Sequence, residues 1–205
     1  MASCRIHITG ASGSGTTTLG RALATLLAVP HHDSDDYFWE PTDPPYTAKR
    51  DEAERLALMR RLFVPRAGWV LSGSLVGWGD PLIPCFDLVV FLHADTAVRV
   101  DRLRRREALR YGADAVSAGG DLHAASRTFL DWAASYDTAP PEGRSRAKHE
   151  RWLSTLPCPV MRLDSARPTA DLAAGVMAHL RPDRVTAPDP GAISRAPTDD
   201  GVPPA

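Results

Sequence analysis

Residues 10–18, GASGSGTTT, have the glycine and hydroxyl spacing of a loop that wraps around phosphate groups. They follow the apolar run CRIHI and open the helix-like stretch TTTLGRALATLLA, as the P-loop pattern G-x-x-x-x-G-K-[ST] requires. Glycines allow a tight turn, and the amides of residues 13–18 can point at an anion at the helix N-terminus. We therefore predict nucleotide binding through nine residues: Gly10, Ala11, Ser12, Gly13, Ser14, Gly15, Thr16, Thr17 and Thr18.

The P-loop pattern is broken at one position, because Thr16 stands where the lysine belongs. That lysine is the point charge that reaches the β- and γ-phosphates. Either another cation replaces it, or the protein binds nucleotide and performs little chemistry. Thr17 keeps the hydroxyl that holds Mg²⁺ on a nucleoside triphosphate.

An acidic pair leaves the next β-like run, HHDSDD, at residues 31–36. Ligands of open parallel sheets gather outside the carboxyl ends of the strands, so these carboxylates should lie beside the phosphate loop. We predict Asp33 as a metal partner together with Thr17, and Asp35 as the base or the contact to an acceptor hydroxyl. The alternative is an acidic surface turn that caps a neighbouring segment.

Arginines dominate the helix-like stretch VRVDRLRRREALR at 98–110. Arg102 and Arg105 are three residues apart, so they can share a helix face and clamp a transferring phosphoryl group. With Lys49–Arg50 they are the candidates to replace the missing lysine, and the predicted catalytic set is Asp35, Lys49, Arg102 and Arg105. A solvated helix face is the alternative.

Other polar and aromatic residues allow two interpretations. The basic set Arg144, Arg146 and Lys148 suits a lid or recognition of a base, and helix solubility explains it equally well. Trp78 and Asp80 follow the run WVLSGS and suit either an acceptor pocket or packing. His7 and four tryptophans are expected in the core rather than at a ligand: Trp39, Trp69, Trp132 and Trp152.

Strand-like and helical segments alternate along the chain. We expect strands at 4–10, 30–33, 69–74, 87–94 and 158–164, and helices at 16–28, 51–66, 96–110, 121–138, 144–155 and 169–180. This order predicts an α/β fold, a three-layer α/β/α sandwich with a five-stranded parallel sheet. One domain should span 1–181, and the Pro-rich residues 182–205 should form a disordered tail.

Composition excludes several classes of protein. The net charge of −1 gives no footprint for nucleic acid or an anionic membrane, and no base-reading motif is present, so direct nucleic-acid binding is not expected. No apolar run approaches a membrane span. The three cysteines are scattered, which is typical of reduced thiols. The cysteines and the lack of a membrane span together favour a cytoplasmic protein.

The segments GASGSGTTTLG, D-x-D-D-Y-F-W, VLSGS and the arginine-rich stretch resemble the nucleoside-monophosphate-kinase-like branch of P-loop proteins, in particular bacterial adenylate-kinase-related or topology-modulation-like proteins. The D-x-D pair is also similar to that of shikimate and gluconate kinases. The resemblance implies ATP with Mg²⁺ and phosphoryl transfer to a small-molecule or nucleotide acceptor. The alternative, motivated by Thr16, is a nucleotide-binding regulatory or pseudo-kinase module with weak or no turnover.

Overall fold

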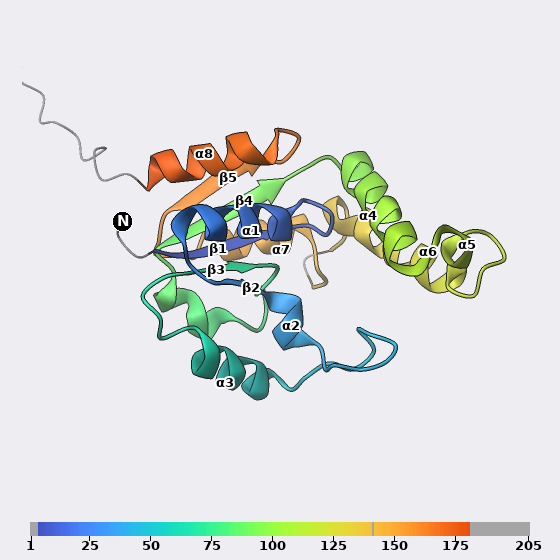
Figure 1. Ribbon diagram of the computed structural model, residues 1–205, viewed down its shortest axis with the longest axis horizontal. Coiled ribbons are helices and arrows are strands. Elements are labelled where there is room, and N and C mark those ends of the chain that lie inside the picture. Colours follow the sequence, from blue (N-terminus) through green and yellow to red (C-terminus); the bar gives the residue numbers. More distant parts are fainter. Residues whose placement is uncertain (1–3, 141, 181–205) are drawn as a thin grey trace, which may run out of the picture.

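A parallel five-stranded sheet forms the centre of the computed structural model, which describes residues 4–140 and 142–180. The strands are β1 (Arg5–Gly10), β2 (His31–Asp33), β3 (Trp69–Ser72), β4 (Leu88–His93) and β5 (Val160–Asp164), in the spatial order β2-β3-β1-β4-β5. This architecture confirms the predicted fold class (Figure 1). The predicted tail at 182–205 lies outside the described residues.

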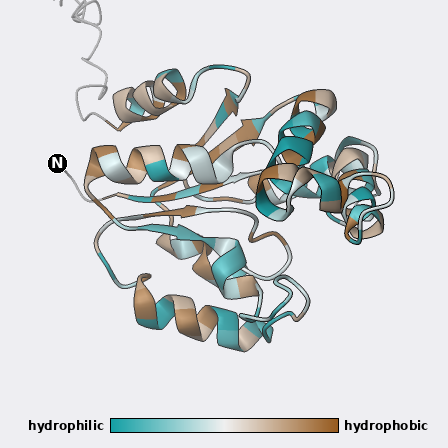
Figure 2. Ribbon diagram, turned by 45° about the vertical axis from the view of Figure 1, so that its right-hand side comes forward, coloured by the Kyte–Doolittle hydropathy of each residue, from teal (hydrophilic) through white to brown (hydrophobic). Residues whose placement is uncertain are grey.

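Both faces of the sheet are covered, because its strands alternate large apolar side chains between two clusters. Leu88, Val90 and Leu92 of β4 pack towards one cluster, whereas Val89 and Phe91 pack into the other. The unbroken apolar run DLVVFL therefore has the two-sided burial expected of a central parallel strand. Figure 2 shows the same pattern as brown strands between partly polar helices.

The helices lie in two layers on the sheet. Leu19 and Leu23 of α1 (Thr16–Leu27) and Leu172 and Val176 of α8 (Thr169–His179) cover one face. The other face is covered by α3 (Glu52–Leu62), the 3₁₀ helix η1 (Asp80–Cys85) and α7 (Arg146–Leu153). As predicted, His7 is fully buried in this second layer, where its Nδ1 lies 3.1 Å from the carbonyl oxygen of Leu71.

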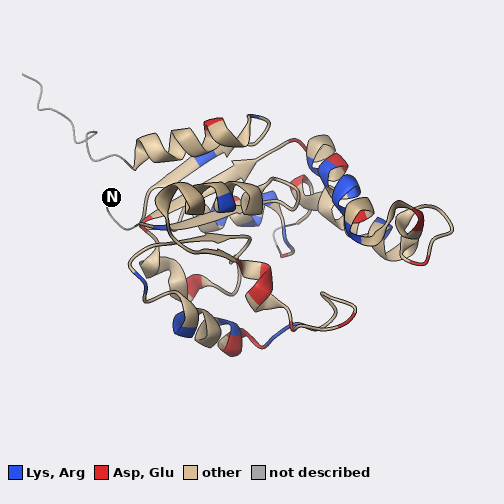
Figure 3. Ribbon diagram, viewed as in Figure 1, with Lys and Arg blue, Asp and Glu red and all other residues tan. Residues whose placement is uncertain are grey.

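A helical arm extends beyond the carboxyl ends of the strands. It consists of α4 (Thr96–Tyr111), α5 (Ala113–Val116), α6 (His123–Ala134) and the 3₁₀ turn η2 (Ser135–Asp137). Figure 1 shows these elements side by side, and α4 contacts both α5 and α6. Basic residues follow one another along α4, and acidic residues lie on α2 across the strand ends (Figure 3).

The segment after β2 differs from its prediction. No helix was predicted at this point, but α2 (Ser34–Phe38) begins there because Asp33 accepts the amide hydrogen of Asp35 at 3.1 Å, an N-cap. Residues 40–50 form no regular helix, yet they fold back on themselves. Trp39 and Lys49 form an isolated antiparallel bridge, which holds Lys49 close to α2.

Candidate functional site

The glycine-rich loop connects β1 to α1 at the centre of the sheet. Gly13 and Gly15 have φ values of 81° and 91°, a left-handed conformation that glycine adopts without steric cost. A Cβ on Gly13 would lie 2.6 Å from the carbonyl oxygen of Arg99, so glycine is required there for two reasons. The helix begins at Thr16 directly after the loop, which is the arrangement that binds phosphate groups at a helix N-terminus.

The hydroxyl and carboxylate predicted to share a metal are in direct contact. Thr17 Oγ1 donates a 2.7 Å hydrogen bond to Asp33 Oδ2, and Ser72 Oγ donates to the same oxygen at 3.1 Å. Hard oxygen donors of this type fit Mg²⁺. Within 4–140 and 142–180 no group of three or more His, Cys, Asp or Glu could hold a metal ion, so phosphate oxygens would have to complete the coordination.

Asp35 is the second residue of α2 and lines a cavity of about 470 Å³ beside the phosphate loop. Desolvation in this cavity and the neighbouring carboxylate of Asp33 raise the pKa of Asp35, while Arg144 and Arg106 oppose the rise. We call this space the first cavity; Thr16, Thr17 and Asp33 also line it. A carboxylate with a raised pKa next to a phosphate loop has the properties of a general base.

The first cavity combines positive charge with aromatic walls. Four cations line it, Lys49, Arg106, Arg144 and Lys148, together with four aromatic side chains, Phe38, Trp39, Trp78 and Trp132. Trp132 is 45% exposed, which corrects the expectation that it is a core residue. Trp39 likewise lines the cavity, whereas Trp69 and Trp152 are buried as predicted.

Arg144, just before α7, lines the first cavity and contacts the phosphate loop. Its Nη2 donates a 3.2 Å hydrogen bond to the carbonyl oxygen of Gly10. Its Nε is buried and has no hydrogen-bond partner among the described residues. Burial lowers the pKa of Arg144, and Asp35 counteracts this shift. A buried donor without a partner is costly, so Arg144 has hydrogen-bonding capacity that the described residues do not use.

The two arginines predicted to clamp a phosphoryl group do not line the first cavity, although Arg102 contacts the carbonyl oxygen of Gly13 at 3.5 Å. Arg105 is paired with Asp101 at 2.7 Å on an exposed part of α4 and lines neither cavity. Arg102 donates to the carbonyl oxygen of Ser165 at 2.8 Å and lies on the other side of the phosphate loop. Arg106 faces the first cavity instead, because one residue turns a helical side chain by about 100°.

The second cavity, of about 410 Å³, contains Arg102. Its walls come from the start of α1 and from the segment after β5, including Gly15, Thr18, Ser165 and Pro168. The first cavity is thus bordered by charged side chains of α2 and α7, whereas this one is bordered by the loop that precedes α8. The phosphate loop separates them and could hold a ligand that reaches into both.

The other polar candidates divide between packing and the cavity. Asp80 accepts a 2.8 Å hydrogen bond from Trp152 Nε1, so it has a packing contact and does not line either cavity. Trp78 does line the first cavity, and the guanidinium of Arg55 stacks 5.3 Å from its ring centroid. Of the basic set around 144–148, Arg146 is exposed and lies outside both cavities.

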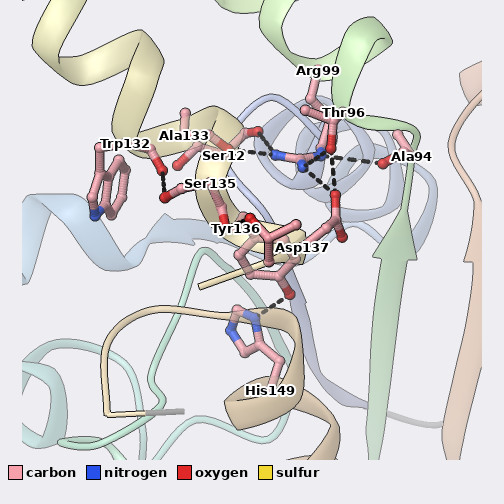
Figure 4. Close-up of polar contacts among 11 residues, drawn as sticks. Ser12, Ala94, Thr96, Arg99, Trp132, Ala133, Ser135, Tyr136, Asp137 and His149 are labelled. Carbon is pink, nitrogen blue, oxygen red and sulfur yellow. Dashed lines mark hydrogen bonds and ion pairs between the residues drawn. The ribbon is translucent and has the colours of Figure 1, made fainter. Parts of the chain in front are cut away.

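A buried arginine that the sequence analysis did not single out connects the arm to the phosphate loop (Figure 4). Arg99 is 1% exposed and forms a 2.7 Å ion pair with Asp137 of η2. It also donates to the carbonyl oxygens of Ala133 at 3.0 Å and Ser12 at 3.5 Å. Its neighbours in the sequence gave no sign of this role, because burial of a charged side chain depends on the tertiary contacts of η2.

In the part of the chain that the structure describes, no helix is long and apolar enough to cross a membrane.

Comparison with known proteins identifies the class. The parallel sheet, its strand order and the glycine-rich loop between β1 and α1 define a P-loop protein with the fold of small-molecule kinases, which confirms the resemblance noted from sequence. Residues 6–116 match the family described as an AAA domain, and the chain belongs to that family.

Individual proteins are similar to the chain in sequence or in fold. The chain is 48% identical over 159 residues to YqaC of Bacillus subtilis (strain 168), described as uncharacterized, covering 78% of this chain and 87% of that protein. Among solved structures, shikimate kinase from Acinetobacter baumannii in complex with shikimate has a TM-score of 0.54 at 16% identity, over 90% of this chain and 96% of that one. A sugar kinase from Janibacter sp. HTCC2649 has a TM-score of 0.48 at 15% identity, over 86% and 93%.

Proposed function

We propose that this protein transfers a phosphoryl group from ATP to a small acceptor held in the first cavity, with Mg²⁺ as cofactor. One observation carries the proposal. Thr17, Asp33, Asp35 and Arg144, whose Nε has no partner among the described residues, all line one cavity at the phosphate loop. Such an arrangement provides a metal partner, a base and a cation for a single in-line transfer.

Nucleotide phosphates are proposed to lie against the backbone amides of residues 10–18, at the N-terminus of α1. Thr17 and Asp33 are the residues that would hold Mg²⁺, and their existing contact keeps both oxygens at the loop. When bound, Mg²⁺ neutralises charge on the phosphate oxygens. The second cavity, with Arg102 on its wall, is proposed to receive the base of the nucleotide.

Asp35 is proposed to orient the acceptor and to accept the proton of its hydroxyl group. Its raised pKa supports this role, since a base works best when its pKa approaches the working pH. The cations Arg106 and Lys148 and the aromatic rings of the cavity favour an acceptor that has an anionic group and an apolar body. Nucleotides, sugar phosphates and sugar acids share that chemistry.

Arg144 is proposed to supply the charge that Thr16 lacks, with Lys49 as a second cation. Arg144 is fixed to Gly10 of the phosphate loop, whereas Lys49 is exposed on the folded-back segment 40–50. A preorganised donor at developing transition-state charge contributes about 3 kcal/mol, which corresponds to a rate factor of about 100. One such arginine is enough to compensate for a missing lysine.

A nucleotide-binding regulatory module with weak or no turnover is the second candidate. Thr16 favours it, because this side chain lines the first cavity without offering a positive charge. The two candidates differ in a single outcome: the kinase consumes ATP only when the correct acceptor is present, whereas the regulatory module binds ATP and consumes none with any acceptor.

A coupled ATP-consumption screen tests the proposal, with nucleoside monophosphates, sugars and polyol acids as acceptors and Mg²⁺ present. The expected result is acceptor-dependent turnover that Asp35→Asn abolishes. Measurable ATP binding without turnover on any acceptor class would contradict the kinase and support the regulatory module.

A further inference from the structure

Three side chains form a hydrogen-bonded chain that ends at the wall of the first cavity. Ser74, after β3, lines the cavity, and its Oγ lies 3.1 Å from Nε2 of His149 on α7. The other ring nitrogen, Nδ1, lies 2.5 Å from the hydroxyl oxygen of Tyr136, and Figure 4 shows this contact. His149 and Tyr136 are 1% and 5% exposed, so water cannot readily replace either partner.

The imidazole ring of His149 is uncharged at neutral pH. Burial lowers the pKa of His149 to about 3, and the positive charges of Arg144 and Lys148 act in the same direction. A neutral imidazole has one N–H and one bare nitrogen, so it donates on one side and accepts on the other. Which side donates decides whether Ser74 uses its proton inside the protein or offers it to the cavity.

Tyr136 decides the direction. Its hydroxyl proton has no other acceptor among the described residues, and a buried donor without a partner is costly. Tyr136 therefore donates to Nδ1, which leaves the ring hydrogen on Nε2. That hydrogen is donated to Ser74 Oγ, and no acceptor for the Ser74 proton exists among the described residues. The hydroxyl group of Ser74 remains free to donate into the cavity.

We propose that Ser74 is a specificity-determining residue. His149 and Tyr136 hold its hydroxyl group as a hydrogen-bond donor, which selects a phosphoryl-acceptor substrate that places an oxygen lone pair at this point of the cavity. This inference rests on the proposed function for its substrate. Lys148 lies beside the loop that follows β3 and contains Ser74, because a Cβ on Gly77 of this loop would lie 3.5 Å from Nζ of Lys148. A carboxylate or phosphate oxygen fits between a hydroxyl donor and an ammonium, whereas an amine does not.

Two measurements test the proposal separately from the proposed function. The first is ¹H–¹⁵N NMR of the histidine rings of the whole chain, with His149 assigned by its loss in His149→Gln. The expected signals are those of a neutral ring with hydrogen on Nε2, and Tyr136→Phe shifts the ¹⁵N resonance of Nδ1, because that bare nitrogen loses the hydrogen bond from the tyrosine hydroxyl. A wild-type ring with hydrogen on Nδ1, or a charged ring at pH 7, would overturn the proposal whether or not the protein is a kinase.

The second measurement is kinetic and uses the acceptor found in the ATP-consumption screen. Loss of one hydrogen bond in Ser74→Ala raises the KM for the acceptor about tenfold and leaves the KM for ATP unchanged. Tyr136→Phe raises the acceptor KM in the same direction, and the control Tyr111→Phe, on α4, does not. An unchanged acceptor KM in a folded, active Ser74→Ala protein would overturn the proposal.

Discussion

The two cavities on either side of the phosphate loop differ in whether their arginines already have partners. In the second cavity, Arg102 donates to both the carbonyl oxygen and the hydroxyl of Ser165, at 2.8 and 3.1 Å. In the first cavity, Arg144 has one contact to Gly10 and a buried Nε without a partner among the described residues. The hydrogen-bond donors of Arg102 thus have acceptors in the protein itself, whereas Arg144 still lacks one for its Nε.

This difference indicates that the two cavities have different roles. A satisfied arginine forms part of a wall, which suits recognition of an uncharged ring. An unsatisfied arginine opposite a carboxylate of raised pKa suits the place where charge moves. We infer that bond-making takes place on the side of α2 and α7, and that the side of β5 and α8 holds the nucleotide in place.

The largest effect is expected for the base of the first cavity. Asp35→Asn removes the proton acceptor and should lower kcat for the acceptor reaction by about 10²- to 10⁴-fold. Affinity for ATP, measured by calorimetry, should remain within a few-fold of wild type. The control Asp131→Asn removes only a weak surface pair with Arg127 at 3.9 Å and should have wild-type kcat. Equal rates for Asp35→Asn and wild type would remove Asp35 from the mechanism.

The next largest effect is expected for the unpartnered arginine. Arg144→Ala should lower kcat by about 100-fold, because it removes a preorganised donor at the phosphate loop. The matched control is Arg151→Ala, which removes an exposed arginine of α7 away from both cavities. If the two variants behaved alike in steady-state assays, the charge that replaces the lysine would have to come from Lys49.

A smaller effect is expected on the other side of the loop. Arg102→Ala loses its contacts to Ser165 and one wall of the second cavity, so nucleotide affinity should fall about tenfold with little change in kcat. Titration calorimetry measures this, with Arg104→Ala on the exposed face of α4 as control. A large fall in kcat without a change in affinity would place chemistry in the second cavity and break the comparison.

The smallest effect is a change in pH dependence. Asp35 acts in its ionised form, so activity is lost as the pH falls through its raised pKa. Arg106 stabilises the ionised form, and Arg106→Ala should therefore raise this pKa further and move the acidic limb of the kcat/KM profile to higher pH. The limb should stay in place in Arg104→Ala. A shift to lower pH in Arg106→Ala would contradict the assignment of Asp35 as base.

The fold and the proximity of Thr17 to Asp33 could be predicted because they depend on local patterns. Alternating strand and helix segments specify a parallel sheet, and the carboxyl ends of its strands bring Thr17 and Asp33 together. The helix α2 was missed, although an aspartate followed by two acidic residues is a typical N-cap signal.

Local patterns did not show which of the many cations lie together, although Lys49 was among the candidates and does line the first cavity. Many arginines lie along α4, so its sequence does not reveal which ones face the cavity, and Arg106 rather than Arg105 does. Arg144 is far from the loop in sequence, and its burial depends on how α7 packs on the sheet. The exposure of Trp132 could not be predicted either, because it depends on how α6 of the helical arm is positioned.

Titration of ATP and ADP in the presence of Mg²⁺ tests the central claim most directly, using wild type, Arg144→Ala and the double variant Arg144→Ala/Thr16→Lys. We predict that wild type binds ATP about tenfold more tightly than ADP, that Arg144→Ala loses this preference, and that the introduced lysine restores it. Absence of ATP binding by the folded wild-type protein, or an unchanged preference in Arg144→Ala, would contradict the account.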